Sequence, residues 1–312
     1  MSLVVVGSMA FDAIETPFGK SDRIIGGAAT YIAWSASNFA TPIKQLSVVG
    51  GDFPKEELQM LEARGVITEG VEIKENEKSF FWSGRYHLDM NTRDTLDTQL
   101  NVLANFNPVV PESYQDCEFL MLGNLVPAVQ NAVIDQMKKK PKLVVLDTMN
   151  FWMETAMADL EKVLSKVDVL MVNDSEARQL SAQYSLVKAA KVIMNMGPKY
   201  LIIKKGEHGA LLFHEDQVFF APALPLEEVF DPTGAGDTFA GGFIGHIAKT
   251  KDISFENMKS AIIVGSAMAS FCVEKFGTTR LKEISKADID ARIQQFVPVS
   301  YTHLRAHETV LD

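Results

Sequence analysis

Cysteine is nearly absent from this sequence of 312 residues, which contains only Cys117 and Cys272. Two distant cysteines provide neither a disulfide framework nor a CxxC metal site, so we expect both to be buried as small apolar side chains. Positive charge is also scarce, because 30 Lys and Arg stand against 40 Asp and Glu. The resulting net charge of −10 disfavours nucleic acid and anionic membranes as partners, since both need basic patches.

Long apolar runs are missing as well. The uncharged stretch at 261–273 is too short to cross a bilayer. The N-terminus, MSLVVVGSMAFD, lacks a basic segment and reaches Asp12 too early for a secretory signal. The composition, 47% hydrophobic and 22% charged, is that of an ordinary globular protein. We therefore expect a cytoplasmic protein that binds neither nucleic acid nor a membrane.

The C-terminal residues do not resemble native protein sequence. Residues 299–309 read VSYTHLRAHET, which resembles the translation of a transposon-end adapter used in sequencing-library preparation. We expect residues 299–312 to be a non-native tail, so that the natural C-terminus is missing or replaced after about Pro298. His303 and His307 are four residues apart, a spacing that can suggest a helical metal pair, and they are excluded for this reason.

Short runs rich in Val, Leu and Ile alternate with longer amphipathic segments. The runs predict strands and the segments predict helices: strands at 3–6, 45–49, 119–122, 143–146, 169–172 and 201–203, and helices at 55–64, 129–138, 176–183 and 186–194. A hairpin at 210–213 and 218–220 and helices at 238–249 and 255–273 follow. Buried strands separated by helices predict an α/β fold in which helices cover both faces of a mainly parallel sheet.

Residues 79–103 interrupt this alternation with an aromatic, β-rich segment that includes Phe80, Phe81, Trp82 and Tyr86. Together with residues 11–14, it predicts a small sheet that closes as a lid over the carboxyl edge of the main sheet. A lid that packs on itself or on a partner subunit, forming a homodimer, is the alternative. Without a Pro/Gly-rich linker or an internal repeat, residues 1–298 are predicted to form one domain.

The most informative motif is DPTGAGDTFAGGF at residues 231–243. Gly234, Ala235 and Gly236 are small enough for backbone amides to approach a ligand, and they precede a predicted helix, whose N-terminus attracts phosphate. Asp237 is the acid beside these amides. It either caps the helix or takes the proton of an attacking hydroxyl while the amides stabilise a transferred phosphoryl group.

This motif resembles the C-terminal signature of the ribokinase-like (PfkB) family of carbohydrate and nucleoside kinases. Dinucleotide and P-loop motifs are absent: no GxGxxG follows the first strand, and Ile14 stands where a P-loop ending at Gly19-Lys20-Ser21 needs its first glycine. The resemblance extends over residues 1–298 and includes a VGGD turn at 49–52. It implies a ribokinase-like three-layer α/β/α fold with a small β lid.

On the substrate side, the resemblance implies that Asp12 binds hydroxyls and that Gly26 and Gly27 let substrate and lid approach. Tyr31 stands where the family commonly has asparagine, so one substrate hydrogen bond is lost or altered. We also expect Arg85 in the lid segment to meet a substrate phosphate, and Asp147, after a strand, to touch substrate or phosphate.

On the nucleotide side, the resemblance implies binding of ATP and Mg²⁺. Asn173 and Glu176 match an NxxE motif that organises magnesium, although they also fit a simple helix start. The implied glycine turn near the phosphates and the implied adenine pocket comprise Lys205, Gly206, Gly209, Ser266 and Gly277. Lys204 is an alternative to Lys205, and either can be a solvated lysine. Asp231 and Thr233 match positions that bind a monovalent cation, so K⁺ is a further expectation.

The sequence thus predicts an ATP-dependent kinase, a phosphotransferase with an alcohol group of a sugar or nucleoside as acceptor. Asp237 is the expected base and residues 234–236 the expected anion hole. A phosphosugar or vitamin-type kinase of the same fold is one alternative. A catalytically silent regulatory member of the family is the other, and the intact Asp237 and glycine loop argue against it.

Overall fold

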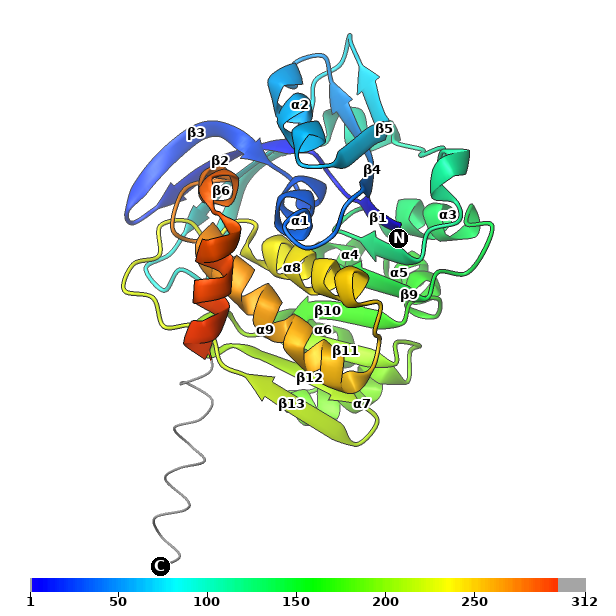
Figure 1. Ribbon diagram of the computed structural model, residues 1–312, viewed down its shortest axis with the longest axis vertical. Helices are drawn as coiled ribbons and strands as arrows, with labels where there is room; N and C mark the ends of the chain where they lie inside the picture. Colours follow the sequence, from blue (N-terminus) through cyan, green and yellow to red (C-terminus); the bar gives the residue numbers. More distant parts are fainter. Residues whose placement is uncertain (1, 297–312) are drawn as a thin grey trace, which may run out of the picture.

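The computed structural model describes residues 2–296 (Figure 1). The predicted non-native tail lies outside these residues. None of the described helices is long and apolar enough to cross a membrane. Cys117 and Cys272 are both buried free thiols, as their apolar surroundings predict.

The centre of the molecule is a nine-stranded sheet in the order β13-β12-β11-β10-β9-β8-β1-β4-β5. All neighbouring pairs from β11 to β5 are parallel, and the last two strands, β12 and β13, form an antiparallel hairpin at one edge. The strands are β1 (Leu3–Val6), β4 (Ile43–Gly50), β5 (Val66–Lys74), β8 (Phe119–Leu122), β9 (Leu143–Asp147), β10 (Val169–Asn173), β11 (Tyr200–Lys204), β12 (Ala210–His214) and β13 (Gln217–Ala221). The predicted mainly parallel α/β fold is confirmed.

Helices cover both faces of this sheet. Alternate strand residues belong to two separate cores: Leu3 and Val5 face one, and Val4 and Val6 face the other. The first core contains residues of α1 (Ala28–Ala36), α2 (Lys55–Ala63), α8 (Ala235–Thr250) and α9 (Phe255–Cys272). The second contains residues of α3 (Pro127–Asp135), α4 (Asn150–Thr155), α5 (Met157–Leu164), α6 (Asp174–Ser181) and α7 (Leu186–Met194).

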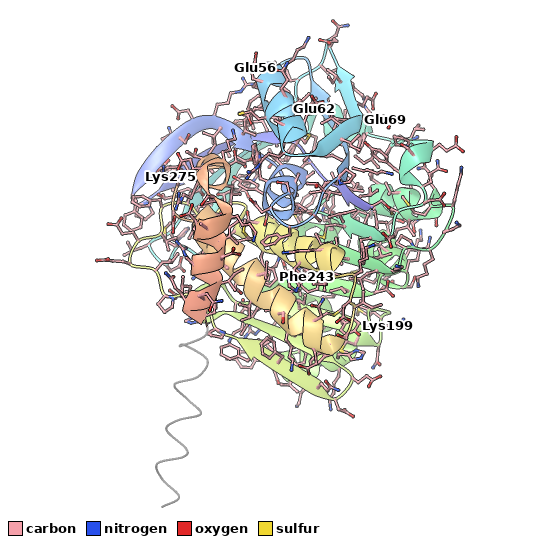
Figure 2. The ribbon with its side chains drawn as sticks, in the orientation of Figure 1. Glu56, Glu62, Glu69, Lys199, Phe243 and Lys275 are labelled. Atoms are coloured by element: carbon pink, nitrogen blue, oxygen red, sulfur yellow. The ribbon has the colours of Figure 1, made fainter. Side chains whose placement is uncertain are left out.

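On the first face, α1 packs against α8 and α8 packs against α9 (Figure 1). Phe243 of α8 is fully buried there, whereas charged side chains such as Glu56 and Lys199 lie at the periphery (Figure 2). A short helix, α10 (Thr279–Glu283), and a helical segment at 286–296 complete the described chain.

Several elements were not predicted from the sequence, among them α1, α4, α5, α10 and β5. Helix α1 is buried along its whole length, so it has no polar face and shows no amphipathic period. Strand β5 lies at the edge of the sheet and carries several charged residues, so it lacks the continuous apolar run of the inner strands.

A second sheet of four strands, in the order β3-β2-β6-β7, projects beside the main body (Figure 1). Its strands are β2 (Ala10–Thr16), β3 (Gly19–Gly26), β6 (Phe80–Tyr86) and β7 (Arg93–Gln99). It contains both segments expected to form the small sheet, together with β3, which was not anticipated. Short 3₁₀ turns at Asn101–Asn105 and Glu112–Tyr114 follow it.

Asp52, in the turn after β4, connects the two sheets. Its carboxylate accepts hydrogen bonds from the backbone and hydroxyl of Ser79 at 2.7 and 2.8 Å, just before β6, and from Arg23 on β3 at 2.7 Å. These donors hold the pKa of Asp52 below its usual value. The base of the small sheet is thereby attached to the carboxyl end of β4.

Candidate active site

Polar residues converge where the central parallel strands end. Asp147, Asn173 and Lys204 are the last residues of β9, β10 and β11, which are neighbours in the sheet. The ammonium of Lys204 lies 3.0 Å from both carboxylate oxygens of Asp147. It also lies 3.1 Å from where a side chain at Gly236 would begin, so Lys204 reaches the start of α8. The carboxyl edge of a parallel sheet is the usual place for a ligand in this architecture.

The glycine loop, which contains Gly234, Ala235 and Gly236 at the start of α8, is held in place by Asp231. One carboxylate oxygen of Asp231 accepts a hydrogen bond from the backbone N–H of Thr233 at 2.9 Å, and the other accepts one from Gly277 at 3.0 Å. Gly234 then adopts φ +75° as the N-cap residue of α8. This left-handed conformation favours glycine, and the backbone N–H of Ala235, the first residue of α8, donates to the carbonyl of Pro232 at 3.2 Å.

Tyr31 of α1 lies directly against this loop. A Cβ atom at Gly234 would stand 2.4 to 2.5 Å from three carbons of the Tyr31 ring. The tyrosine is 1% exposed, and its hydroxyl has no hydrogen-bond partner among residues 2–296. Burial and the nearby acids, led by Asp12, raise its pKa well above the usual value. The structure therefore places Tyr31 against the glycine loop and away from solvent.

The site contains carboxylates that resist ionisation. Loss of hydration raises the pKa of the partly buried Asp237 to about 7, and the neighbouring charge of Asp147 adds to the shift while Lys204 opposes it. Loss of hydration also raises the pKa of Asp12, on β2, to about 8, with further contributions from Asp231 and Asp237. The Asp12 carboxylate fills the space where Gly26 would carry a Cβ, only 1.8 Å away. Asp12, Asp237 and the glycine loop thus form one cluster.

We expect Asp12→Asn to stabilise the protein, and to do so more at pH 8 than at pH 5. In the unfolded chain Asp12 ionises near 3.8, whereas in the folded protein it keeps its proton to about 8, so its contribution to stability falls as pH rises between these values. The gain in free energy of unfolding at pH 8 should be about 1–3 kcal/mol. Thermal denaturation at both pH values measures it, with the exposed Asp216→Asn as control. An equal shift at the two pH values would contradict this origin.

Asn173 and Glu176 form a capping box at the start of α6. The Asn173 side chain accepts a hydrogen bond from the Glu176 backbone at 2.8 Å, and the Glu176 carboxylate accepts one from the Asn173 backbone at 2.7 Å. Glu176 is buried, which raises its pKa to about 7, while the nearby charge of Lys204 opposes the shift. The pair therefore starts a helix and also places a carboxylate beside Lys204.

The turn after β11 brings two glycines into left-handed conformations. Gly206 has φ +54° and Gly209 has φ +82°, and a Cβ at Gly209 would lie 2.0 Å from the carbonyl oxygen of Ala221. The backbone of Lys205 donates to Gly209 at 2.8 Å. Of the two adjacent lysines, the structure places Lys204 at the centre of the carboxylate cluster.

The hairpin of β6 and β7 touches the site at two points. The Thr233 hydroxyl donates to the hydroxyl of Tyr86, on β6, at 3.2 Å. In the turn between β6 and β7, Asn91 lies so close to Gly206 that a Cβ there would be 2.5 Å from its side-chain oxygen. Arg85 is not brought to the site, because its guanidinium pairs with Glu15 on β2 at 2.9 and 3.2 Å.

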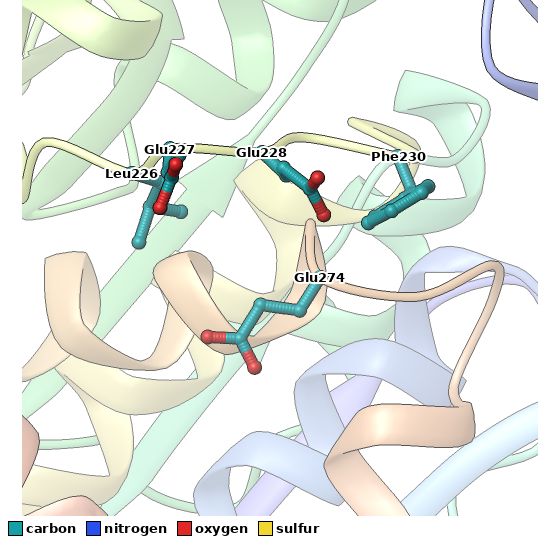
Figure 3. Close-up of a pocket in the computed structure, with 5 residues that line it drawn as sticks. All are labelled: Leu226, Glu227, Glu228, Phe230 and Glu274. Carbon is teal, nitrogen blue, oxygen red and sulfur yellow. The ribbon is translucent and has the colours of Figure 1, made fainter.

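A cavity of about 300 Å³ lies beside the glycine loop (Figure 3). The segment leading into the motif contributes Leu226, Glu227, Glu228 and Phe230, and Glu274 faces it from just beyond α9. Arg280 and Arg292 hold the Glu274 carboxylate at 2.8 and 2.6 Å. Ser266, half-buried on α9, and Gly277 do not line this cavity, although Gly277 follows the same helix end.

The chain is similar to known proteins. A family model described as pfkB family carbohydrate kinase matches residues 2–284. The chain is 28% identical over 283 residues to the cytidine kinase of Thermococcus kodakarensis, covering 89% of this chain and 98% of that protein. It is 24% identical over 305 residues to a nucleoside kinase of Methanothermobacter thermautotrophicus, covering 88% of this chain and 90% of that protein.

Solved structures share the fold. Burkholderia thailandensis nucleoside kinase in complex with inosine superposes with a TM-score of 0.74 at 21% identity, covering 95% of this chain and 99% of that one. A putative ribokinase II from E. coli in complex with ATP and Mg²⁺ superposes with a TM-score of 0.75 at 19% identity, covering 94% of this chain and 99% of that one.

The chain therefore belongs to the pfkB family of carbohydrate kinases. It is a sugar or nucleoside kinase of the ribokinase type, a phosphotransferase with an alcohol group as acceptor.

Proposed function

We propose that this protein transfers the γ-phosphate of ATP to a hydroxyl of a nucleoside. The observation that carries the proposal is the position of Asp237, which follows the Gly234–Gly236 amides in the first turn of α8 and has a pKa raised to about 7. A base whose pKa lies near the operating pH is well suited to accept a proton from a hydroxyl. The adjacent amides are suited to stabilise the negative charge of the phosphoryl group.

The acceptor would lie between the small sheet and the glycine loop. Asp12 would bind its hydroxyls, and Gly26 and Gly27 leave the space for that contact. Gly27, at φ +92°, is wedged against the backbone of Ser8 and Ala10, where a Cβ would lie 2.5 Å from a carbonyl oxygen. A nucleoside is favoured because several relatives are named cytidine or nucleoside kinases. The pairing of Arg85 with Glu15 argues against the phosphosugar alternative, which depended on Arg85.

ATP would lie along the Gly206 turn toward the cavity beside Phe230 and Glu274, which is suited to hold its base. The residues present also fit magnesium, which prefers one or two carboxylates together with phosphate oxygens and water. Glu176 and Asn173 would hold it from the edge of the site, and when bound it would neutralise phosphate charge. A K⁺ site at Asp231 and Thr233 remains a prediction. In the structure, both carboxylate oxygens of Asp231 accept hydrogen bonds from backbone N–H groups.

The acidity of Asp237 predicts the pH dependence of the reaction. The base acts only as the carboxylate, so kcat/KM for the acceptor should rise with pH up to about 7 and then level off. At one pH unit below the pKa, activity should be about one tenth of the plateau. Initial rates with saturating ATP and Mg²⁺ between pH 5.5 and 8.5 measure the profile. A flat profile over this range in a protein that stays folded would contradict the assignment of the base.

ADP release by the full chain, with ATP and Mg²⁺, tests the proposed function. The acceptor panel should contain cytidine, uridine, adenosine, inosine, ribose, fructose and their phosphates. Turnover with a nucleoside supports the proposal, whereas turnover only with a phosphorylated sugar supports the phosphosugar alternative. ATP binding without turnover on any acceptor would instead support a silent regulatory role.

We further propose that residues 1–298 act as one kinase domain whose small sheet is the lid. Contacts of Tyr86 and Asn91 with the glycine loop and turn support this role. Strand β7 is exposed along its length, which leaves an edge available for the predicted homodimer. Light scattering of the full chain would measure the oligomeric state.

A further inference from the structure

Asp147 and Lys204 form a buried ion pair that the proposed reaction does not yet use. The ammonium of Lys204 lies 3.0 Å from both carboxylate oxygens of Asp147, and the two side chains are 17% and 7% exposed. A buried ion pair is weak evidence for stability, because the loss of hydration offsets most of the attraction between the charges. Its place at the carboxyl edge of the sheet indicates a role in the site instead.

The register of the strands explains why this pair lies beside the start of α8. Asp147 aligns with Met171 on β10, and Met171 aligns with Ile202 on β11. Both of these apolar residues belong to the first core, which α8 helps to form. Residues in register share a face of the sheet, and so do residues two apart on one strand. Asp147 and Lys204 therefore both project to the side of the sheet that α8 covers.

Asp237 consequently has a cation and an anion as close neighbours. The Lys204 ammonium lies 3.1 Å from where a side chain at Gly236 would begin, one residue before Asp237. Loss of hydration raises the pKa of Asp237 to about 7, the charge of Asp147 adds to the rise, and the charge of Lys204 opposes it. Burial would lower the pKa of Lys204 itself, but the surrounding carboxylates, led by Asp147, raise it. The ammonium therefore keeps its charge beside the base.

Other elements bring further titratable and charged groups to this cluster. Glu176 on α6 acts on the ammonium of the pair. Around Asp237 the further groups are Asp12 on β2, Tyr31 on α1, Arg93 on β7 and Cys272 on α9. All of these groups stay the same when only the pair is changed, so a difference between variants of the pair reports the pair alone.

We propose that the ion pair of Asp147 and Lys204 sets the pH at which the base Asp237 becomes active. The inference rests on the proposed function and deepens it. In the transfer, the acceptor oxygen forms a bond to the γ-phosphorus while the bond to the β,γ-bridging oxygen breaks, and the acceptor proton passes to the carboxylate of Asp237. Lys204 favours that carboxylate, whereas Asp147 favours the protonated form. Both are positioning residues, because they act through Asp237.

The test compares Lys204→Gln, Asp147→Asn and the double variant in the full chain, by the pH profile of kcat/KM for the acceptor. Lys204→Gln should raise the midpoint of the profile by at least about one pH unit, and Asp147→Asn should lower it by about as much. Relative to each protein's own plateau, activity should then fall about fivefold at pH 7 in the first variant and rise about fivefold at pH 6 in the second. The double variant should return to within about 0.5 pH unit of the wild type, because both opposing charges are gone.

The matched control is Lys199→Gln, which makes the same substitution at the opposite end of β11. Lys199 also lies near an aspartate, 3.7 Å from the carboxylate of Asp168, but at the amino edge of the sheet and at the periphery of the molecule (Figure 2). It should leave the midpoint unchanged. NMR of the full chain, with aspartate labelled with ¹³C at the carboxyl carbon, measures the same midpoint without an acceptor, and Asp237→Asn identifies the Asp237 signal.

Opposite shifts in the two single variants are the result that a purely structural pair would not give. Midpoints that move in the same direction, or that do not move, would overturn the proposal, as would a lower plateau as the only change. Opposite shifts of the Asp237 NMR signal with no turnover of any acceptor would uphold the role of the pair and reject the proposed reaction. An Asp237 signal that does not titrate between pH 5.5 and 9.5, in a protein that phosphorylates a nucleoside, would reject the role of the pair and leave the kinase function in place.

Discussion

Asp237→Asn should reduce kcat for phosphoryl transfer by about 10²–10⁴-fold while leaving nucleotide binding nearly intact. The amide keeps the shape of the carboxylate and still borders the Gly234–Gly236 amides, but it cannot accept the acceptor's proton. Its loss should not destabilise the protein, because the native carboxylate is kept partly protonated by its surroundings. The measurement is ADP release with saturating ATP and acceptor, together with the dissociation constant for ADP.

The matched control for this variant is Asp216→Asn, which makes the same change in the exposed turn between β12 and β13. It should leave kcat unchanged. Full turnover by Asp237→Asn on an acceptor that the wild type uses would remove Asp237 as the base. Helix capping, the other role open to an acid at this position, would then be its remaining function.

Gly234→Ala should both destabilise the protein and inactivate it. Alanine at φ +75° carries a backbone penalty of about 1–2 kcal/mol, and its Cβ would stand 2.4 Å from the Tyr31 ring. Overpacking of this kind costs about 1–3 kcal/mol more. Relief of the clash must move either Tyr31 or the loop, and a shifted loop misdirects its amides. We expect kcat to fall about 10²-fold or more, as measured by ADP release alongside chemical denaturation.

The variant Tyr31→Leu separates the backbone penalty of Gly234→Ala from the clash with the Tyr31 ring. Combined with Gly234→Ala, it removes the ring that the new Cβ meets and leaves the backbone penalty. The double variant should therefore lose less free energy of unfolding than the sum of the single variants. Strict additivity would show that Tyr31 does not support the loop, and the destabilisation of Gly234→Ala would then arise from the backbone alone.

The order of strands and helices follows from the sequence because each inner strand is buried on both faces. Such strands must be short and apolar, as in Leu143–Leu146 and Val169–Val172, and the helices between them must be amphipathic. The glycine loop is equally local, since its small residues and the helix that follows are consecutive. This is why the sequence alone indicates phosphate chemistry at residues 234–237.

Helix α1 and strand β5 could not be predicted in this way. A helix buried on all sides has no polar face to mark its period, and an edge strand has no need to be uniformly apolar. The packing of Tyr31 against Gly234 could not be predicted either, because the two residues are more than 200 positions apart in the chain and no local pattern marks their contact.

The basic residues of the site were decided by tertiary structure. Consecutive residues on a strand point to opposite faces, so one position separates Arg85, which pairs with Glu15, from Tyr86, which meets Thr233. The register of β6 with β7 then brings Arg93 beside Tyr86. Lys204 rather than its neighbour Lys205 reaches Asp147 through the pairing of β9, β10 and β11. The sequence by itself determined the fold class and indicated a glycine loop suited to phosphate, because both depend on local pattern. Strand pairing decided which basic side chains lie near the acidic residues of the site, because it sets the distances between residues that are far apart in the chain.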